Sequence, residues 1–572
     1  MKIVSPLAIL AAVLMMIPSL TTLGTQAFTM PPTRTFRSAL LVAAATTTSR
    51  TTARAASTTT TCAAEPLQKT SESYQKLLTK LQSITHLQRV QAVLGYDQLV
   101  FMPQAASAER GNQLSALAGL IHEQTTNPEL KDLIGQALRD VDTAGSEDTD
   151  AKRLLELEQK AYEENERISA DLAAKAASLG STAYTAWTTA RENDDFDAFA
   201  PVLEECFETA MELSKAKRGN AERDLYSQML DEYEVGMPQD RIDEIFGEIQ
   251  EALVPLIQRV LESSYQPSTD PLMGDFNVDA QKELGTDIVT KLGFDINLGR
   301  IDVSVHPFTN SFSPKDVRIT SRYRTDEWYQ GLAAMIHEGG HAMYEQNLGD
   351  SATRLDTALS MGTHESQSLF WERHIGLSES FWEWALPQWK EKFPDEFKKT
   401  TARQVYEAVN NVSPSLIRVE ADELTYPLHV ILRYRIEREV IEGKLPVKDI
   451  AQRWKDDMKT LLNVNVPTDR EGCLQDVHWS ALAFGYFPTY LIGSASAAQL
   501  CHFCKQDLPN MDELVQKGEF GPIKEWVVEK VHKHGKRYES LDALFEAQLG
   551  EKLNPKYFIE YLTDKYSDIY KL

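Results

Sequence analysis

The chain has 572 residues, a length that allows about four domains of average size or one large helical unit. Hydrophobic residues make up 42% of it and charged residues 25%, which excludes a wholly disordered chain and a protein with many membrane spans. Acidic residues outnumber basic ones by 84 to 59, which argues against a nucleic-acid partner, and five cysteines are too few for a disulfide scaffold.

The first 64 residues differ in chemistry from the rest of the chain. They contain five basic residues and no acidic one, and their apolar run over 7–17 is too short to span a bilayer but fits the core of a signal peptide. Ala27 and Phe28 suit a cleavage junction, and a Ser/Thr/Ala/Arg-rich stretch typical of a transit peptide follows. The segment resembles the bipartite presequences of algae with complex plastids. We therefore expect 1–64 to direct 65–572 to a plastid, with secretion or mitochondrial import as alternatives.

From residue 65 onwards most windows have a helical period, and no repeat of 20–50 residues is present. No segment beyond the presequence is apolar and long enough for a membrane anchor. The stretch 150–179 is rich in Glu, Lys and Ala and predicts one long exposed helix. Further helical windows cover 203–219, 241–264, 401–410, 427–442, 450–462 and 536–549. The sequence predicts one large, mainly α-helical domain.

One region departs from this helical pattern. Residues 299–306 and 316–321 alternate apolar and polar side chains, and turn-forming residues lie between them. The pattern predicts a small β-hairpin or ribbon, directly before the strongest motif in the chain. Its edge could pair with an extended peptide backbone.

That motif is an HExxH sequence, His337 to His341, on a predicted helix with apolar flanks. The i, i+4 spacing places both imidazoles on one face, where they can share a Zn²⁺ ion, and Glu338 lies beside them to polarise a water molecule. Gly339 and Gly340 each cost about 1 kcal/mol inside a helix, which suggests that something approaches the backbone closely there.

A catalytic zinc ion usually has three protein ligands and one open position. The best candidate for the third is Glu365, at the start of a helical stretch 24 positions beyond His341. The competitors are Glu345, which would need a strongly curved helix, His364, which would make a three-histidine site, and Glu372, which could instead lie outside the ligand set. Zinc, two histidines and two glutamates indicate hydrolysis.

Six segments of the chain resemble the carboxypeptidase Taq family of zinc metallocarboxypeptidases, in the family's order, and 96–110 resembles it as well. The similarity covers about 70–570, and we find no departure at these motifs. The segments are His306–Phe308, Asp316–Thr320, His337–His341, His364–Gln367, Ile417–Asp422 and Gly472–Trp479.

The resemblance implies a nearly all-helical, saddle-like domain with a deep groove, zinc on its floor, and a homodimer. It implies removal of single residues from the free C-termini of peptides. It also implies His337, His341 and Glu365 as metal ligands and Glu338 as general base. Zn²⁺ is the expected metal, one per chain, with Co²⁺ and Mn²⁺ as possible substitutes.

A carboxypeptidase must also recognise the terminal carboxylate, and arginine does this with two parallel hydrogen bonds. Arg418 is the first choice, supported by the resemblance, although it could pair structurally with Asp422; Arg318 is the runner-up. His478 and Tyr486 or Tyr490 are candidates for hydrogen bonding the oxyanion, with a buried structural role as the alternative for His478. The other candidates for supporting roles are His306, Gln475 and Asp476.

Two other functions remain open at this point. An endopeptidase or oligopeptidase could use the same zinc chemistry without an arginine beyond the scissile bond. A non-catalytic scaffold could retain a metal site, but the intact Glu338 argues against it because structural zinc is usually closed by four ligands.

Overall fold

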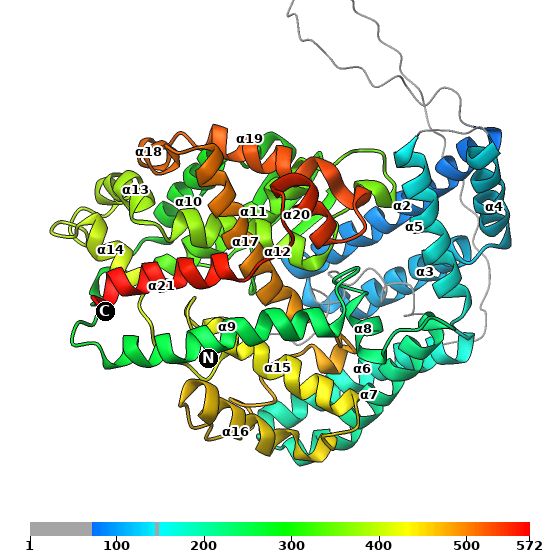
Figure 1. Cartoon of the computed structure of the whole chain (residues 1–572), viewed down its shortest axis with the longest axis horizontal. Coiled ribbons are helices and arrows are strands. Elements are labelled where there is room, and N and C mark those ends of the chain that lie inside the picture. Colours follow the sequence, from blue (N-terminus) through cyan, green and yellow to red (C-terminus); the bar gives the residue numbers. More distant parts are fainter. Residues whose placement is uncertain (1–70, 144–147) are drawn as a thin grey trace, which may run out of the picture.

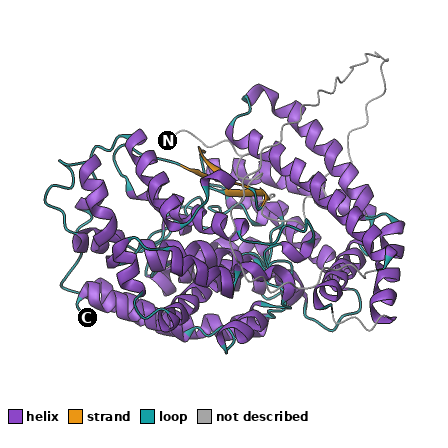
Figure 2. Ribbon diagram, turned by 90° about the horizontal axis from the view of Figure 1, so that it is seen from above, coloured by secondary structure: helices purple, strands orange, loops and turns teal. Residues whose placement is uncertain are grey.

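The computed structural model describes residues 71–143 and 148–572, and the expected presequence lies outside them. The described chain is mainly helical with one small sheet, as the sequence predicts (Figure 1; Figure 2). No helix in these residues is both apolar enough and long enough to cross a membrane.

The N-terminal helices lie together at one side of the molecule (Figure 1). They are α2 (Glu72–Val100), α3 (Ser107–Thr125), α4 (Pro128–Thr143) and α5 (Thr149–Glu166). Helices α2, α4 and α5 share a small apolar core of their own, to which Leu77, Ile134 and Leu155 belong. This core is separate from the large one that holds the rest of the protein together.

The prediction of one long helix over 150–179 is wrong, because the structure has two helices there. Helix α5 ends at Glu166, and α6 (Ala170–Asn193) begins after Ser169, whose hydroxyl accepts a hydrogen bond from the backbone N–H of Leu172 at 3.2 Å. Such a serine cap satisfies a free N–H group and starts a new helix. Neither helix is fully exposed, since Leu155 and Leu179 are buried.

The large core is built by helices from the rest of the chain (Figure 1). The C-terminal helix α21 packs along both α9 and α17 and so contacts helices from the middle and the late part of the chain. Besides α6, these helices are α7 (Phe196–Arg218), α8 (Leu225–Leu230), α9 (Gln239–Glu262), α10 (Val278–Leu292), α11 (Tyr329–Gln346), α12 (Met361–Leu369), α13 (Glu379–Lys392), α14 (Ala402–Val409), α15 (Tyr426–Ile441), α16 (Ile450–Leu462), α17 (Pro488–Asp507), α18 (Met511–Lys517), α19 (Gly521–Lys530), α20 (Leu541–Leu549) and α21 (Lys556–Tyr570).

The small sheet lies beside α11, as expected, but its pairing differs from a simple hairpin. Its order is β1 (Gly299–Val303), β3 (Asp316–Ser321) and β2 (Thr309–Ser313), with β1 parallel and β2 antiparallel to β3. The polar composition of 309–313 suggested a turn, yet Phe312 on this strand is buried. The strand also brings Thr309 against α11.

Two glycines explain how closely α11 packs on its neighbours. A Cβ atom at Gly340 would lie 2.6 Å from the carbonyl oxygen of Gln367 on α12, and one at Gly339 would lie 2.3 Å from Val289 on α10. On the far side of α12, a Cβ at Gly493 of α17 would lie 2.7 Å from Glu365. Helices α11, α12 and α17 are therefore held at separations that only glycine allows.

Candidate active site

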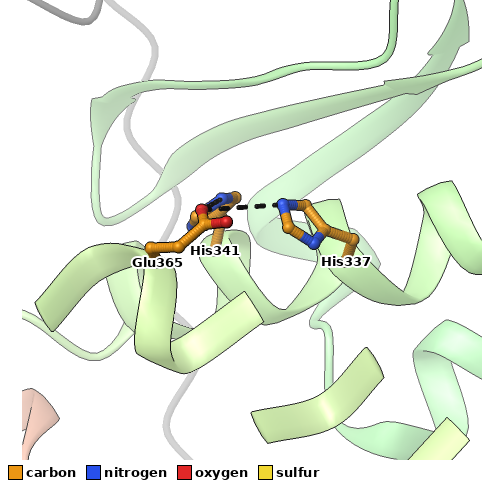
Figure 3. Close-up of side chains that lie close together, drawn as sticks. All are labelled: His337, His341 and Glu365. Atoms are coloured by element: carbon orange, nitrogen blue, oxygen red, sulfur yellow. Dashed lines mark ion pairs between the residues drawn. The ribbon is translucent and has the colours of Figure 1, made fainter. Parts of the chain in front are cut away.

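The structure brings together His337 and His341 of α11 and Glu365 of α12 (Figure 3). One nitrogen or oxygen atom from each lies within 4.8 Å of the others. The Glu365 Oε2 atom is 3.8 Å from His337 Nε2 and 3.4 Å from His341 Nε2. Their side chains are only 23%, 12% and 15% exposed, so the three groups face one another in a largely water-poor site.

The outer nitrogen of each imidazole is bound to a neighbouring group. His337 Nδ1 lies 2.7 Å from Glu372 Oε2, and His341 Nδ1 lies 3.1 Å from the carbonyl oxygen of His364. These bonds hold the rings so that both Nε2 atoms face Glu365. Such partners commonly orient metal-binding histidines and increase their basicity. Glu372 therefore supports the site from outside the cluster.

The other two competitors for the third ligand position lie to one side. His364 Nε2 is bound to Glu345 Oε1 at 3.0 Å, and His364 Nδ1 is 2.6 Å from His341 Nδ1, on the side of that ring away from Glu365. Neither His364 nor Glu345 belongs to the cluster of three found among the described residues.

The electrostatics of the cluster favour a cation. Burial acts to raise the pKa of Glu365, but His337 and His341 lower it to about 2, so the carboxylate is ionised. Burial acts to lower the pKa of His337, but the carboxylates of Glu365 and Glu372 raise it to about 10. The carboxylates of Glu365 and Glu372 make the electrostatic potential negative here. A positive charge is therefore favoured at the point where the three side chains meet.

Glu338 directly follows His337 in α11 and is buried beside the cluster. The Thr309 hydroxyl donates a hydrogen bond to Glu338 Oε2 at 2.7 Å, fixing the orientation of the carboxylate. Burial raises the pKa of Glu338, while the nearby His337 and the Thr309 hydroxyl act in the opposite direction. Thr309 was not predicted as a site residue, because its strand was interpreted as a turn.

A groove with a cavity volume of about 1640 Å³ passes over the cluster. Its wall extends from α2 and α3 on one side to α17 on the other. The lining includes His337, Glu338, His341 and Glu365. Arg418, Tyr426, Tyr486 and Tyr490 line the same groove. The deep groove that the resemblance implied is therefore present.

Arg418 is 5% exposed, and its partner is not Asp422. Its Nε and Nη2 atoms donate to Asp476 Oδ1 at 3.2 and 2.9 Å, and its Nη1 atom donates to the Tyr426 hydroxyl at 3.3 Å. Asp476 also binds Arg433, with Nε to Oδ2 at 2.6 Å. Asp422 instead accepts backbone N–H groups just before α15, including that of Thr425 at 3.0 Å.

His478 lies behind the groove wall and is not among the residues that line it. Its Nε2 atom is 3.1 Å from the hydroxyl of Tyr490, which does face the groove. Burial lowers the pKa of His478 to about 3 despite the nearby Asp476 carboxylate, so the ring is neutral. Tyr486 lines the groove, with its ring 5.1 Å from that of Tyr233.

Two of the three remaining candidates have structural partners, and the third lies outside the groove lining. Arg318 forms two 2.8 Å hydrogen bonds with Asp316 and stacks between Tyr96 and Phe312. Gln475 accepts a hydrogen bond from the backbone N–H of Arg418 at 2.8 Å and so braces that segment. His306 has an exposed side chain outside the groove lining.

Comparison with known proteins agrees with this geometry. The family model for carboxypeptidase Taq (M32) metallopeptidase matches residues 76–566. Carboxypeptidase 1 of Bacillus subtilis is 39% identical over 494 residues, covering 86% of this chain and 97% of that protein. Thermostable carboxypeptidase 1 of Thermus thermophilus is 34% identical, covering 87% and 99%.

Solved structures give the same result. The crystal structure of the M32 carboxypeptidase from Deinococcus radiodurans R1 superposes with a TM-score of 0.84 at 32% identity, covering 88% of this chain and 100% of that one. Trypanosoma cruzi metallocarboxypeptidase 1 gives a TM-score of 0.82 at 34% identity, covering 86% and 99%. The chain described here therefore belongs to the carboxypeptidase Taq (M32) family and is a metallocarboxypeptidase.

Proposed function

We propose that this metallocarboxypeptidase releases single residues from the free C-termini of peptides, using one Zn²⁺ ion held by His337, His341 and Glu365 and Glu338 as general base. The observation that carries the proposal is the convergence of the two Nε2 atoms and one carboxylate oxygen within 4.8 Å on the groove floor.

The donor atoms fit zinc. Two imidazole nitrogens and one carboxylate are a ligand set of catalytic zinc sites, which keep a further position open. The outer nitrogens are bound to Glu372 and to the His364 carbonyl, so the inner ones are available. When bound, zinc supplies a Lewis acid that acidifies a water molecule and polarises a peptide carbonyl. Co²⁺ and Mn²⁺ are the expected substitutes.

Glu338 is placed to move the proton. Thr309 occupies one carboxylate oxygen, Oε2, which leaves Oε1 to accept a proton from the attacking water and to pass it to the departing amine. The raised pKa of this buried carboxyl suits both steps, because a group that first takes and then gives a proton works best with a pKa near the working pH.

The region around Arg418 accepts the C-terminal residue. Arg418 binds the terminal carboxylate, with its guanidinium oriented by Asp476. Tyr486 and Tyr490 face the groove and supply hydroxyl groups for the developing oxyanion. His478 contributes through its contact with the Tyr490 hydroxyl, which it holds in place from behind.

The test uses an N-blocked peptide and its C-terminally amidated form, with products identified by mass. Stepwise loss of single C-terminal residues is expected to be much faster from the free acid than from the amide, and it disappears with a chelator or in Glu338→Gln. Internal cleavage of the amidated peptide would instead assign an endopeptidase, and a metal-bound protein that cleaves neither peptide would contradict a hydrolytic role.

We also propose that residues 1–64 direct the enzyme to a plastid and that the mature protein, 65–572, is a homodimer. The acid-free composition of the segment supports the first proposal, and the family resemblance supports the second. A fluorescent protein fused to 1–64 that stays out of plastids would contradict the first. Sedimentation of the purified enzyme as a monomer would contradict the second.

A further inference from the structure

A second arginine lines the groove beside the metal centre. Arg373 follows Glu372 in the π-helical segment Phe370–Gly376, which continues directly from α12. π-Helical turns are rare and occur often at functional sites, because the extra residue redirects the side chains that follow. Arg373 is only 8% exposed, although it is charged.

The charge of Arg373 has no counterion among the described residues. Its guanidinium makes one hydrogen bond there, from Nη1 to Ser494 Oγ at 3.2 Å, and no carboxylate of those residues lies within ion-pair distance. The carboxylates whose fields reach it are committed elsewhere: Glu372 to His337 at 2.7 Å, Glu423 to Lys565 at 2.6 Å, and Glu365 to the metal cluster. Buried charges are normally paired at short range, so the Arg373 guanidinium can take an anionic partner from the groove.

Arg418 is in a different position. Two of its nitrogens are bound to Asp476, which it shares with the deeply buried Arg433. Its guanidinium therefore already has a carboxylate partner, whereas that of Arg373 has only a neutral hydroxyl. Of the two arginines that face the groove here, Arg373 has more hydrogen-bond donors to offer.

The two guanidinium groups converge on one part of the groove. Tyr426 lies between them, since Arg373 Cζ is 5.0 Å from its ring centroid and Arg418 Nη1 is bound to its hydroxyl. Helix α17 reaches both from successive turns: the Tyr490 ring centroid is 4.8 Å from Arg418 Cζ, and Ser494 binds Arg373. The intervening turn contains the glycine that packs against Glu365, so this region borders the metal cluster.

We propose that Arg373 is a substrate-binding residue that, together with Arg418, binds the terminal carboxylate of the peptide. A carboxylate offers about four acceptor positions, enough for two arginines, and each charge-assisted bond to it is strong. The terminal carboxylate gives the Arg373 guanidinium a direct ionic partner. This inference rests on the proposed removal of single C-terminal residues.

The experiment compares wild-type enzyme, Arg373→Gln, Arg373→Lys and a control, Arg354→Gln. Arg354 lines the same groove but already has a carboxylate partner, Glu158 at 3.3 Å. The substrates are an N-blocked dipeptide and its C-terminal amide. Bound metal is measured in every variant, and kcat and KM are determined separately.

Arg373→Gln is expected to raise KM for the free acid about 10- to 100-fold, the range for a lost charged hydrogen bond, with kcat within about threefold. Its preference for the acid over the amide falls by the same factor, while Arg373→Lys keeps most of that preference and Arg354→Gln keeps all of it. A merely structural role would lower activity on acid and amide alike, or lower metal content, and either result overturns the proposal.

Where Arg373→Gln does not fold, a crystal structure of the wild-type enzyme with a bound product amino acid decides the question. A product carboxylate hydrogen-bonded to Arg373 supports the proposal, and one bound to Arg418 alone refutes it. The proposed function fails separately, through a wild-type enzyme that cleaves neither dipeptide.

Discussion

The close packing of α11 on α12 makes Gly340→Ala the most informative single change. The new methyl carbon would lie 2.6 Å from two backbone atoms of α12, whereas ordinary contacts begin at 3.4 Å. Because the obstacle is backbone, the helices must separate by about 0.8 Å at this point. His341 is the next residue and Glu365 lies on the other helix, so the separation acts directly on the metal cluster.

Two opposing terms set the expected stability. Alanine is favoured over glycine inside a helix by about 1 kcal/mol, and overpacking costs about 1–3 kcal/mol. We expect a net loss of up to about 2 kcal/mol in the free energy of unfolding. Displacements approaching 1 Å can lower activity about 100-fold, so we expect a fall of about 10- to 100-fold in metal affinity and in kcat/KM.

The matched control is Gly247→Ala, inside helix α9. A Cβ atom there meets nothing within 4 Å, so only the helix-propensity term applies and stability should rise by up to about 1 kcal/mol. Urea unfolding followed by circular dichroism measures stability, and competition with a chromophoric chelator measures metal affinity. If Gly340→Ala behaves like Gly247→Ala in both assays, close helix packing is not the reason for glycine in the motif.

Three further predictions concern carboxylates that are bound to other groups in the folded protein. Burial raises the pKa of Glu234 to about 8, so between about pH 4.5 and 8 the unfolded chain releases a proton that the folded chain keeps, and stability falls as the pH rises. Glu234→Gln should flatten that part of the profile of unfolding free energy against pH; an unchanged slope would contradict the assignment. Glu372→Gln should weaken metal affinity about 10- to 100-fold, because the outer nitrogen of His337 loses its carboxylate; metal titration that gives the wild-type affinity would refute this role. Asp476→Asn should lower the unfolding free energy by about 3–5 kcal/mol, since two buried arginines lose their shared counterion; a loss below about 1 kcal/mol in urea unfolding would show that they find another.

The metal cluster was the most predictable part of the molecule, for a local reason. The spacing of His337 and His341 on one helix fixes their relative position, and Glu365 lies in the middle of the next α-helix, which packs on it. The two glycines between the histidines also pointed correctly to a close approach of backbone. Helical period likewise predicted the class of fold, since the pattern depends on nearby residues alone.

Long-range pairing was not predictable in this way. Arg418 has an acidic residue four positions later, but its partner is Asp476, 58 positions away. The alternating residues of β1 and β3 indicated strands, but not that a third strand would join them or that β1 would run parallel to β3. Arg373 is one of many charged residues in the sequence, and only its burial without a counterion distinguishes it.

The order of these parts along the chain has a consequence for synthesis. The two histidines lie near residue 340, while the groove wall around the C-terminal residue of the substrate needs Tyr490 and Ser494 of α17, and α17 in turn packs against α21 at the end of the chain. A ribosome releases the N-terminal part first. The growing polypeptide thus has its HExxH motif long before it has a complete groove, and it becomes a peptidase only when nearly all of it has been made.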